Sequence, residues 1–194
     1  MNLPKFLCLV LFAGIALTTQ AQQPGQNQNQ NNPEMQAMMA YMTPGDAQMM
    51  LAKSAGDWKA DVTTTMDPSK PPVQSQANVH NEMILGGRYL SQHYTGNMMG
   101  MPFEGMGTIG YDNGKKVYLS TWIDNMGTGI EYLEGKPSAD GKSVEFKGTA
   151  YMPGMGDTPI RQVVTFVDAN HQTFEEYMTA NGKEMKTLSI KLSR

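Results

Sequence analysis

The sequence predicts an all-β protein: a single antiparallel up-and-down β-barrel of about ten strands, with a short N-terminal helical segment covering one end. Short segments of alternating apolar and polar residues follow one another from Trp58 to Leu192, separated by Asn-Gly, Asp-Gly and Gly-Gly pairs. Such regular spacing is typical of a β-sandwich or a β-barrel. Because the connections are short and leave no long return of the Greek-key type, we expect closure into a barrel.

A helical segment precedes the strands. Residues 34–42 are rich in the helix-forming Met, Gln and Ala. Thr43 and Pro44, followed by Asp46, predict the start of a second helix, because a hydroxyl caps a first turn and proline suits its first position. The apolar face of this second helix would consist of Ala47, Met50, Leu51 and Ala55. We expect that face to pack on the barrel.

The expected strands alternate with period two, so each presents one face to the barrel interior. Their ranges are 58–66, 73–85, 88–96, 103–111, 116–124, 128–135, 143–151, 160–168, 173–180 and 184–192. The pairs Asn113-Gly114, Asp140-Gly141 and Asn181-Gly182 predict type I′ hairpin turns, in which both central residues have positive φ. Strands joined by such tight turns are antiparallel.

Residues 1–21 have the features of a secretory signal peptide. Lys5 precedes an apolar run, and the small residues Thr19 and Ala21 precede the expected cleavage site. The run is too short to span a bilayer, and no later segment suits a membrane span either. Residues 22–33 are rich in Gln and Asn and predict a disordered linker, whereas residues 34–194 would form one barrel domain with its N-terminal helices. We therefore expect an exported protein, periplasmic or extracellular.

Composition excludes several classes of function. Without the signal peptide, 14 Lys and Arg face 18 Asp and Glu with no basic cluster, which excludes a nucleic-acid partner. The single cysteine, Cys8, lies in the signal peptide, so the mature chain has no thiolate chemistry and no cysteine-ligated zinc. Known hydrolase motifs are missing from the sequence, and the adjacent Glu175 and Glu176 point to opposite faces of a strand. We expect binding rather than catalysis, without a cofactor; the oligomeric state stays open.

Two apparent motifs have structural interpretations. Gly105, Gly107 and Gly110 match G-x-G-x-x-G, but no helix follows them, so we interpret them as sites of barrel curvature or close approach of another backbone. His80 and His93 are expected to be cross-strand neighbours. Two imidazoles without a nearby acidic pair make a poor metal site, and we assign no metal ligand among them.

The chain contains 18 methionines, concentrated in MQAMMAYM, QMM, NMMGM and YMPGM. Clustered thioethers in an exported protein are candidate ligands for Cu(I). Methionine also fills gaps in cores and forms adaptable rims around apolar sites. The residues in question are Met98, Met99, Met101, Met106, Met152 and Met155. We favour packing or a rim and keep metal binding as an alternative.

Residues 86–129 read GGRYLSQHYTGNMMGMPFEGMGTIGYDNGKKVYLSTWIDNMGTG. The elements Gly-Gly-Arg-aromatic-Leu, Gly-x-Pro-Phe-x-Gly-x-Gly, Gly-Tyr-Asp and Trp-x-Asp occur here in the order in which they occur in the bacterial domain of unknown function 1579 family. The chain resembles that family from Thr43 onward. The resemblance implies no established activity.

A second resemblance concerns the start of the first strand. Gly56-Asp57-Trp58, which follows the helix, is similar to the Gly-x-Trp sequence of calycin-type barrels, the superfamily of lipocalins and fatty-acid-binding proteins. It implies a calycin-like barrel with a ligand cavity. Lipocalins place an arginine after the last strand against this tryptophan, and Arg194 or Lys191 would take that place here.

A barrel of this size has room for a small ligand. Trp122 and Asp124 share a face of their strand, and with Arg88 or Arg161 nearby they would form either a polar anchor for a ligand or a buried ion pair beside a packed indole. The residues expected to orient a ligand are Arg88, His93, Tyr94, Trp122, Asp124, Tyr132 and Arg161. We expect an exported, non-catalytic binding protein for a small apolar or amphipathic ligand. The alternatives are a methionine-rich periplasmic binder of Cu(I) or Ag(I) and an enzyme with an unrecognised site.

Overall fold

The computed structural model describes residues 32–194. The expected signal peptide and nearly all of the expected linker lie outside these residues. The described helices are α1 (Pro33–Met42) and α2 (Asp46–Ala52). The described strands are β1 (Gly56–Thr64), β2 (Val73–Ile84), β3 (Tyr89–Met98), β4 (Met101–Asp112), β5 (Val117–Asp124), β6 (Glu131–Pro137), β7 (Ser143–Met152), β8 (Gly156–Phe166), β9 (His171–Ala180) and β10 (Lys183–Ser193).

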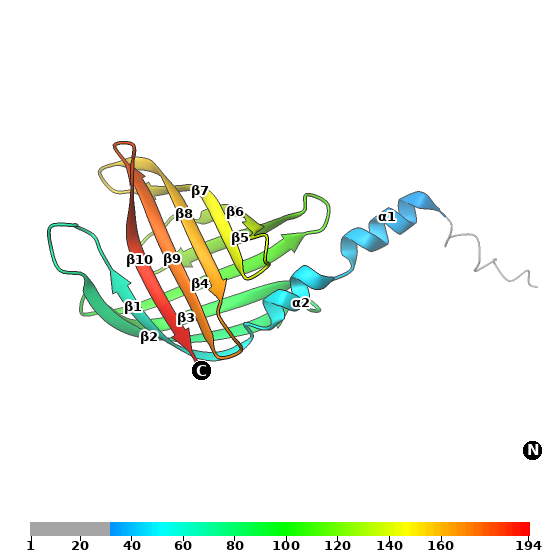
Figure 1. Cartoon of the computed structure of the whole chain (residues 1–194), viewed down its shortest axis with the longest axis horizontal. Helices are drawn as coiled ribbons and strands as arrows, with labels where there is room; N and C mark the ends of the chain where they lie inside the picture. Colours follow the sequence, from blue (N-terminus) through cyan, green and yellow to red (C-terminus); the bar gives the residue numbers. More distant parts are fainter. Residues whose placement is uncertain (1–31) are drawn as a thin grey trace, which may run out of the picture.

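The strands form a closed antiparallel barrel in which each strand pairs with its neighbours in the sequence (Figure 1). Closure comes from β1, which pairs with β2 on one side and with β10 on the other, in a register that runs from Lys59 opposite Ser193 to Thr64 opposite Leu188. This arrangement confirms the predicted up-and-down barrel. The strand boundaries differ most from the expected ranges at β6, which begins three residues later, and at β8, which begins four residues earlier.

The alternation along each strand produces an apolar interior. In β5, Tyr118 is buried, and Trp122 and Asp124 line the interior, whereas Ile123 is exposed on the outer face. Buried apolar side chains gather near α2 around Leu51, Leu90, Ile109, Leu133, Phe146 and Ile160, and near the closing strands around Trp58, Ala60, Val79, Ile190 and Leu192. Both groups lie inside the barrel wall.

Helix α2 covers one end of the barrel, as predicted, and α1 extends away from it (Figure 1). Leu51 of α2 is buried in the interior cluster, with Ala47 and Met50 packed beside it. Neither helix in residues 32–194 has the length and apolar character needed to cross a bilayer.

The predicted cap of α2 at Thr43 is wrong. Thr43 instead ends α1, where its backbone N–H and its hydroxyl both donate to the carbonyl of Met39. The second helix begins after Gly45, whose N–H donates to the side-chain oxygen of Gln48 at 2.8 Å. Proline at position 44 stiffens the link between the two helices, so the chain turns before α2 starts.

Only one of the expected type I′ turns among the described residues has both central residues at positive φ. Asn181 and Gly182 have φ values of 52° and 74° and join β9 to β10. In the Asp140-Gly141 turn only the glycine has positive φ, and in the turn after β4 the positive residue is Lys116. Asn113 has a different role there, because its side-chain N–H₂ donates to the carbonyls of residues 40, 41 and 43 and holds the end of α1.

Arg194 closes the helix end of the barrel. Trp58, which is 2 % exposed, donates its indole N–H to the carbonyl of Ser54, and the guanidinium carbon of Arg194 lies 4.2 Å from the centre of its ring. Arg194 also donates to the carbonyls of residues 53, 55 and 169. The last residue of the chain thus joins the start of β1 to the turn before β9, as the calycin resemblance implies, and Lys191 does not take this role.

Replacing Arg194 with alanine removes the cation–π contact and these hydrogen bonds. We expect Arg194→Ala to lower the free energy of unfolding by about 1–2 kcal/mol, measured by urea denaturation. The control is Lys191→Ala, an exposed cation near the end of β10, which should change the free energy of unfolding by less than about 0.5 kcal/mol. Equal effects of the two substitutions would contradict this role of Arg194.

Candidate functional site

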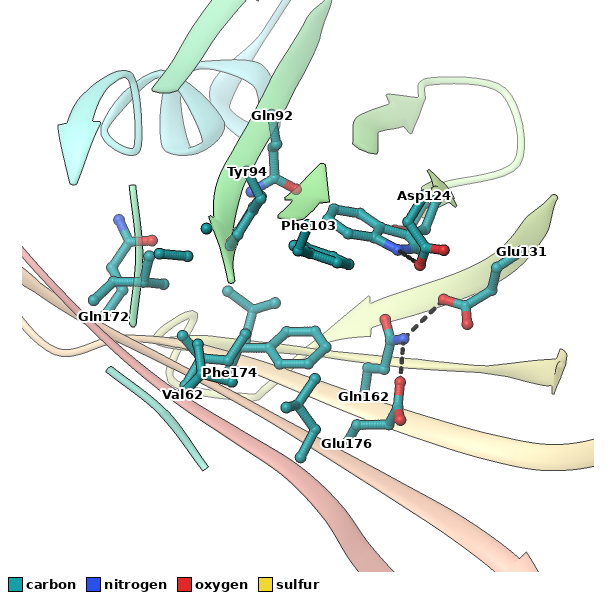
Figure 2. A pocket seen from close by; sticks show the side chains of 18 of the residues that line it. Val62, Gln92, Tyr94, Phe103, Asp124, Glu131, Gln162, Gln172, Phe174 and Glu176 are labelled. Atoms are coloured by element: carbon teal, nitrogen blue, oxygen red, sulfur yellow. Dashed lines mark hydrogen bonds between the residues drawn. The ribbon is translucent and has the colours of Figure 1, made fainter. Parts of the chain in front are cut away.

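A cavity of about 340 Å³ occupies the interior of the barrel (Figure 2). Its walls are mainly aromatic and aliphatic, with contributions from α2 and from most of the strands. The aromatic side chains that line it are Tyr94, Phe103, Trp122, Phe146, Phe166 and Phe174. A volume of this size is within the range of sites for small molecules.

Two glycines of β4 make room for the indole of Trp122 in the wall. Gly107 is directly opposite Trp122 in the register, and Gly105 is opposite Asp124. A Cβ atom on Gly105 would lie 2.3 Å from Cζ2 of Trp122, and one on Gly107 would lie 3.0 Å from its Cε3. The indole therefore lies flat against β4. The glycine motif serves close approach, as the sequence indicated, but the approaching group is a side chain and not another backbone.

Tyr94 and Trp122 form an aromatic corner of the cavity. Their rings meet edge to face with centroids 5.3 Å apart, a favourable arrangement for two aromatic side chains. Burial raises the pKa of the Tyr94 hydroxyl to about 12, so this group stays protonated at physiological pH. Tyr94 therefore presents a neutral hydroxyl within an apolar surface.

Asp124 is held at the end of β5 by neutral donors. Its Oδ2 accepts the indole N–H of Trp122 at 2.9 Å, and its Oδ1 accepts the backbone N–H of Met126 at 2.9 Å. The sequence predicted an arginine donor, Arg88 or Arg161, and that expectation is wrong. The indole and a turn amide orient the carboxylate instead.

Gln162 links two further carboxyl groups across the interior. Its side-chain N–H₂ donates to Glu131 at 2.8 Å and to Glu176 at 3.0 Å (Figure 2). Glu176 also accepts the hydroxyl of Thr187 at 3.0 Å. Gln162 of β8 and Glu176 of β9 are directly opposite each other in the register, Thr187 lies in the bulged part of β10, and Glu131 comes from β6 on the far side of β7.

Burial raises the pKa of Glu131 to about 7. The negative charges of Glu176 and Asp124 act in the same direction, whereas the hydrogen bond from Gln162 opposes the rise. No Lys, Arg or His lies among the described residues that line the cavity. The polar side of the cavity is therefore acidic and has no basic counter-charge in its lining.

The structure brings three of the seven predicted ligand-orienting residues together. Tyr94, Trp122 and Asp124 line the cavity. The remaining four point outward: Arg88, His93, Tyr132 and Arg161 are not part of its lining. For His93, Tyr132 and Arg161 the alternation along the strand places the side chain on the opposite face from the interior residues, whereas Arg88 lies in the turn between β2 and β3.

The outward-facing four each have a partner on the surface. Arg88 donates to the carbonyl of Met42 and so holds the end of α1, and His93 lies 2.9 Å from Glu104. The hydroxyl of Tyr132 donates to Glu134. The guanidinium of Arg161 donates twice to Glu184 and lies 3.9 Å from the centre of the Tyr177 ring. The contact of His93 joins the neighbouring strands β3 and β4, and Arg161 of β8 joins β9 through Tyr177 and β10 through Glu184, on the outside of the barrel.

Glu131, Gln162 and Glu176 are site residues that the sequence did not single out. A signal was present for two of them. Gln162 lies two residues from both Ile160 and Val164, and Glu176 lies two residues from Phe174, so each shares a strand face with apolar residues. Each is therefore a polar residue on the apolar face of its strand. Polar residues at such positions indicate a functional or hydrogen-bonded interior site.

The histidines and methionines occupy mixed positions. His80 and His93 are cross-strand partners, as predicted, but both lie on the outer face, where His80 contacts Asp57. No group of three or more His, Cys, Asp or Glu suited to a metal ion occurs in residues 32–194. Three methionines line the cavity, namely Met98, Met126 and Met152, whereas Met99, Met101, Met106 and Met155 are exposed. Copper binding by these sulfur atoms stays a prediction.

The fit of Trp122 against β4 is open to a direct test. Gly105→Ala places a methyl group on the indole, which Asp124 holds by a hydrogen bond, so we expect the free energy of unfolding to fall by about 1–3 kcal/mol in urea denaturation. Gly129→Ala is the control, because nothing lies within 4 Å of its Cβ position. A Gly105→Ala protein as stable as the control would show that the indole does not rest on β4.

Glu131 makes stability depend on pH. Because its carboxyl binds a proton more tightly in the folded protein than in the unfolded chain, protonation favours folding. This contribution is complete below about pH 4.5 and is lost as the pH rises through about 7. We expect Glu131→Gln, which keeps the acceptor for Gln162, to gain about 2–3 kcal/mol relative to the parent between pH 4.5 and pH 8.

Urea denaturation of the parent and of Glu131→Gln across this pH range measures the difference between their free energies of unfolding. The contributions of the other titrating groups cancel in this difference. Glu134→Gln is the control, since Glu134 lies on the outer face of the same strand. A constant difference between Glu131→Gln and the parent would contradict the raised pKa.

Comparison with known proteins identifies the family and the fold. No curated protein matches the chain. The crystal structure of Rv2717c from M. tuberculosis is similar with 16 % identity and a TM-score of 0.59, covering 78 % of this chain and 99 % of that one. The S-type phycobiliprotein lyase CPES from Guillardia theta is similar with 8 % identity and a TM-score of 0.56, covering 81 % and 96 %. At these identities the likeness shows the fold alone. A family model matches residues 43–194, and the chain therefore belongs to the family of proteins of unknown function DUF1579.

Proposed function

We propose that this protein is exported and binds a small apolar or amphipathic ligand inside its barrel, without catalysing a reaction. The observation that carries the proposal is the cavity of about 340 Å³, which aromatic and aliphatic side chains line on most sides. Export is supported by the signal-peptide features of residues 1–21.

Burial of apolar ligand surface would supply most of the binding free energy, at about 25 cal/mol for each Å² removed from water. Closed barrels of this kind hold ligands because the strands are fully hydrogen-bonded to one another and the interior is preformed. The polar cluster of Glu131, Gln162 and Glu176 would then fix the orientation of the ligand. This combination of an apolar wall with a few convergent polar groups is typical of small-molecule sites.

A catalytic role is the second candidate and rests on one observation. The pKa of about 7 at Glu131 suits a general acid or base near neutral pH. Binding is favoured because the described cavity lining contains no His, Lys or Cys as a nucleophile or partner base. The phycobiliprotein lyase of similar fold is named for an activity on a phycobiliprotein, so this barrel type is compatible with either role.

Filling the cavity tests the proposal. Ser120 lines the cavity, and Thr121 is the next residue on β5 and points the opposite way, so Ser120→Phe and Thr121→Phe form a matched pair. We expect Ser120→Phe to weaken binding of the neutral amphipathic dye Nile red at least about tenfold in a fluorescence titration, because the added ring occupies ligand space. Thr121→Phe should bind the dye like the parent.

Native mass spectrometry of protein from its own host provides the complementary measurement. A co-purified small molecule that is absent from the Ser120→Phe protein would support the proposal. Dye binding that is equal in both variants would place the dye outside the barrel and contradict it. Conversion of the bound molecule on incubation would favour the catalytic candidate.

A further inference from the structure

We infer that the cavity selects ligands with a protonated amine at one end and an apolar chain at the other. This inference rests on the proposed function, because it names the class of ligand that the cavity would bind. It is carried by the carboxyl groups on one side of the cavity, by a hydroxyl at the cavity wall that has no partner in the described residues, and by the aromatic walls.

The charge of the cavity lining has one sign. Asp124, Glu131 and Glu176 line it, and the described lining contains no basic side chain. Among the described strands only β8 contains an arginine. This residue, Arg161, points to the outer face of the barrel and donates hydrogen bonds to Glu184 there. These three carboxylates are partly buried, and partly buried carboxylates without a counter-charge carry a desolvation cost that a cationic group of a ligand would offset.

The carboxyl groups also have unused capacity to accept hydrogen bonds. Asp124 is satisfied at both oxygens by Trp122 and Met126. In contrast, Glu131 accepts one hydrogen bond, from Gln162, and in the described part of the chain nothing donates to its other oxygen. Gln162 has only one N–H₂ group, which it divides between Glu131 and Glu176. An ammonium group carries three donors and would complete this cluster.

Tyr94 supplies an independent indication of a ligand. Its side chain lines the cavity and is 9 % exposed, yet within residues 32–194 no hydrogen bond to its hydroxyl is found. The hydroxyl oxygen is not enclosed by protein, because in residues 32–194 the only enclosed side-chain nitrogen or oxygen without a partner is Oδ1 of Asn81. A hydroxyl left without a partner at a cavity wall is consistent with a polar group that arrives with the ligand or with water.

The aromatic walls suit the same class of ligand. Figure 2 shows Asp124, Glu131, Gln162 and Glu176 on one side of the cavity, with Phe103 and Phe174 beside them. The faces of aromatic rings attract cations, and they also pack well against an alkyl chain. A cationic head would lie near the carboxyl groups, and its chain would follow the apolar wall.

The opposite assignment is a ligand that carries a carboxylate. The protonated form of Glu131 would donate a hydrogen bond to such a group, and the raised pKa of Glu131 makes that form accessible near pH 7. Asp124 and Glu176 stand against it, because both face the same space and would repel a second anion. We therefore favour the cation.

Three probes with one alkyl chain separate these cases: n-octylamine, 1-octanol and octanoate, titrated calorimetrically at pH 8. At this pH the amine is protonated and Glu131 is mostly ionised. We expect n-octylamine to bind at least about tenfold more tightly than 1-octanol, a difference that a charge-assisted hydrogen bond can supply. Octanoate should bind more weakly than 1-octanol.

Variants then locate the preference. In the double variant Glu131→Gln with Glu176→Gln, the affinities for n-octylamine and 1-octanol should agree within about twofold, because both charges are removed and the shapes are kept. Glu134→Gln, on the outer face of β6, should keep the full preference. Tyr94→Phe should weaken n-octylamine binding. The midpoint of thermal unfolding of this variant should stay near that of the parent protein, because the hydroxyl has no hydrogen-bond partner to lose in the described residues.

Several outcomes would overturn the inference. Equal or tighter binding of 1-octanol or octanoate would remove the preference for a cation, while the proposed ligand-binding function would stand. A preference that survives in the double variant would place the amine elsewhere on the protein and refute this assignment. If none of the three probes binds and Nile red also fails to bind, the proposed function itself is refuted.

Discussion

Pairing of β1 with β10 is the interaction on which the rest of the structure depends. It closes the barrel, so every strand among the described residues has a partner on both sides, and the barrel has no free edge. Closure also decides which face of each strand is inside, because neighbouring strands in register must turn the same face inward. The Trp58–Arg194 contact lies beside this seam and holds the two strand ends together.

The two ends of the barrel differ in their chemistry. The end under α2 is filled, with Leu51 and Trp58 buried and Gln172 bonded to Ser54 beneath the helix. Toward the other end of the strands lie Asp124 and Glu131, at the end of β5 and the start of β6. Stability is therefore concentrated at the helix end, and the groups suited to ligand recognition lie away from it.

Placing Glu131 and Glu176 in the barrel interior costs free energy, and close packing of the core does not require carboxyl groups there. Burial raises the pKa of Glu131 to about 7, and Glu131 shares a single amide donor with Glu176. Leucine or valine at these positions would complete an apolar core at lower cost. The glycines of β4 add space by letting the Trp122 indole lie flat in the wall. Space and unpaired charge in the same cavity are features of a binding site more than of a core.

The sequence by itself determined the class of fold, the number and order of the strands, and the two faces of each strand. Period-two alternation and short turns are local properties, so the boundaries of β5 and β10 and the Asn181-Gly182 hairpin were predictable. The same local reasoning placed Tyr94, Trp122 and Asp124 among the candidates.

Only the tertiary structure decided which face is inside and which polar residues meet. In β5 the aliphatic Ile123 points outward and the Trp122 face points inward, because the face of one strand is set by its neighbours after closure. Glu131, Gln162 and Glu176 meet because the tilt and register of β6, β8 and β9 bring them to one level of the barrel. Alternation within a strand contains no information about register between distant strands, and for that physical reason the acidic cluster emerged only from the closed barrel.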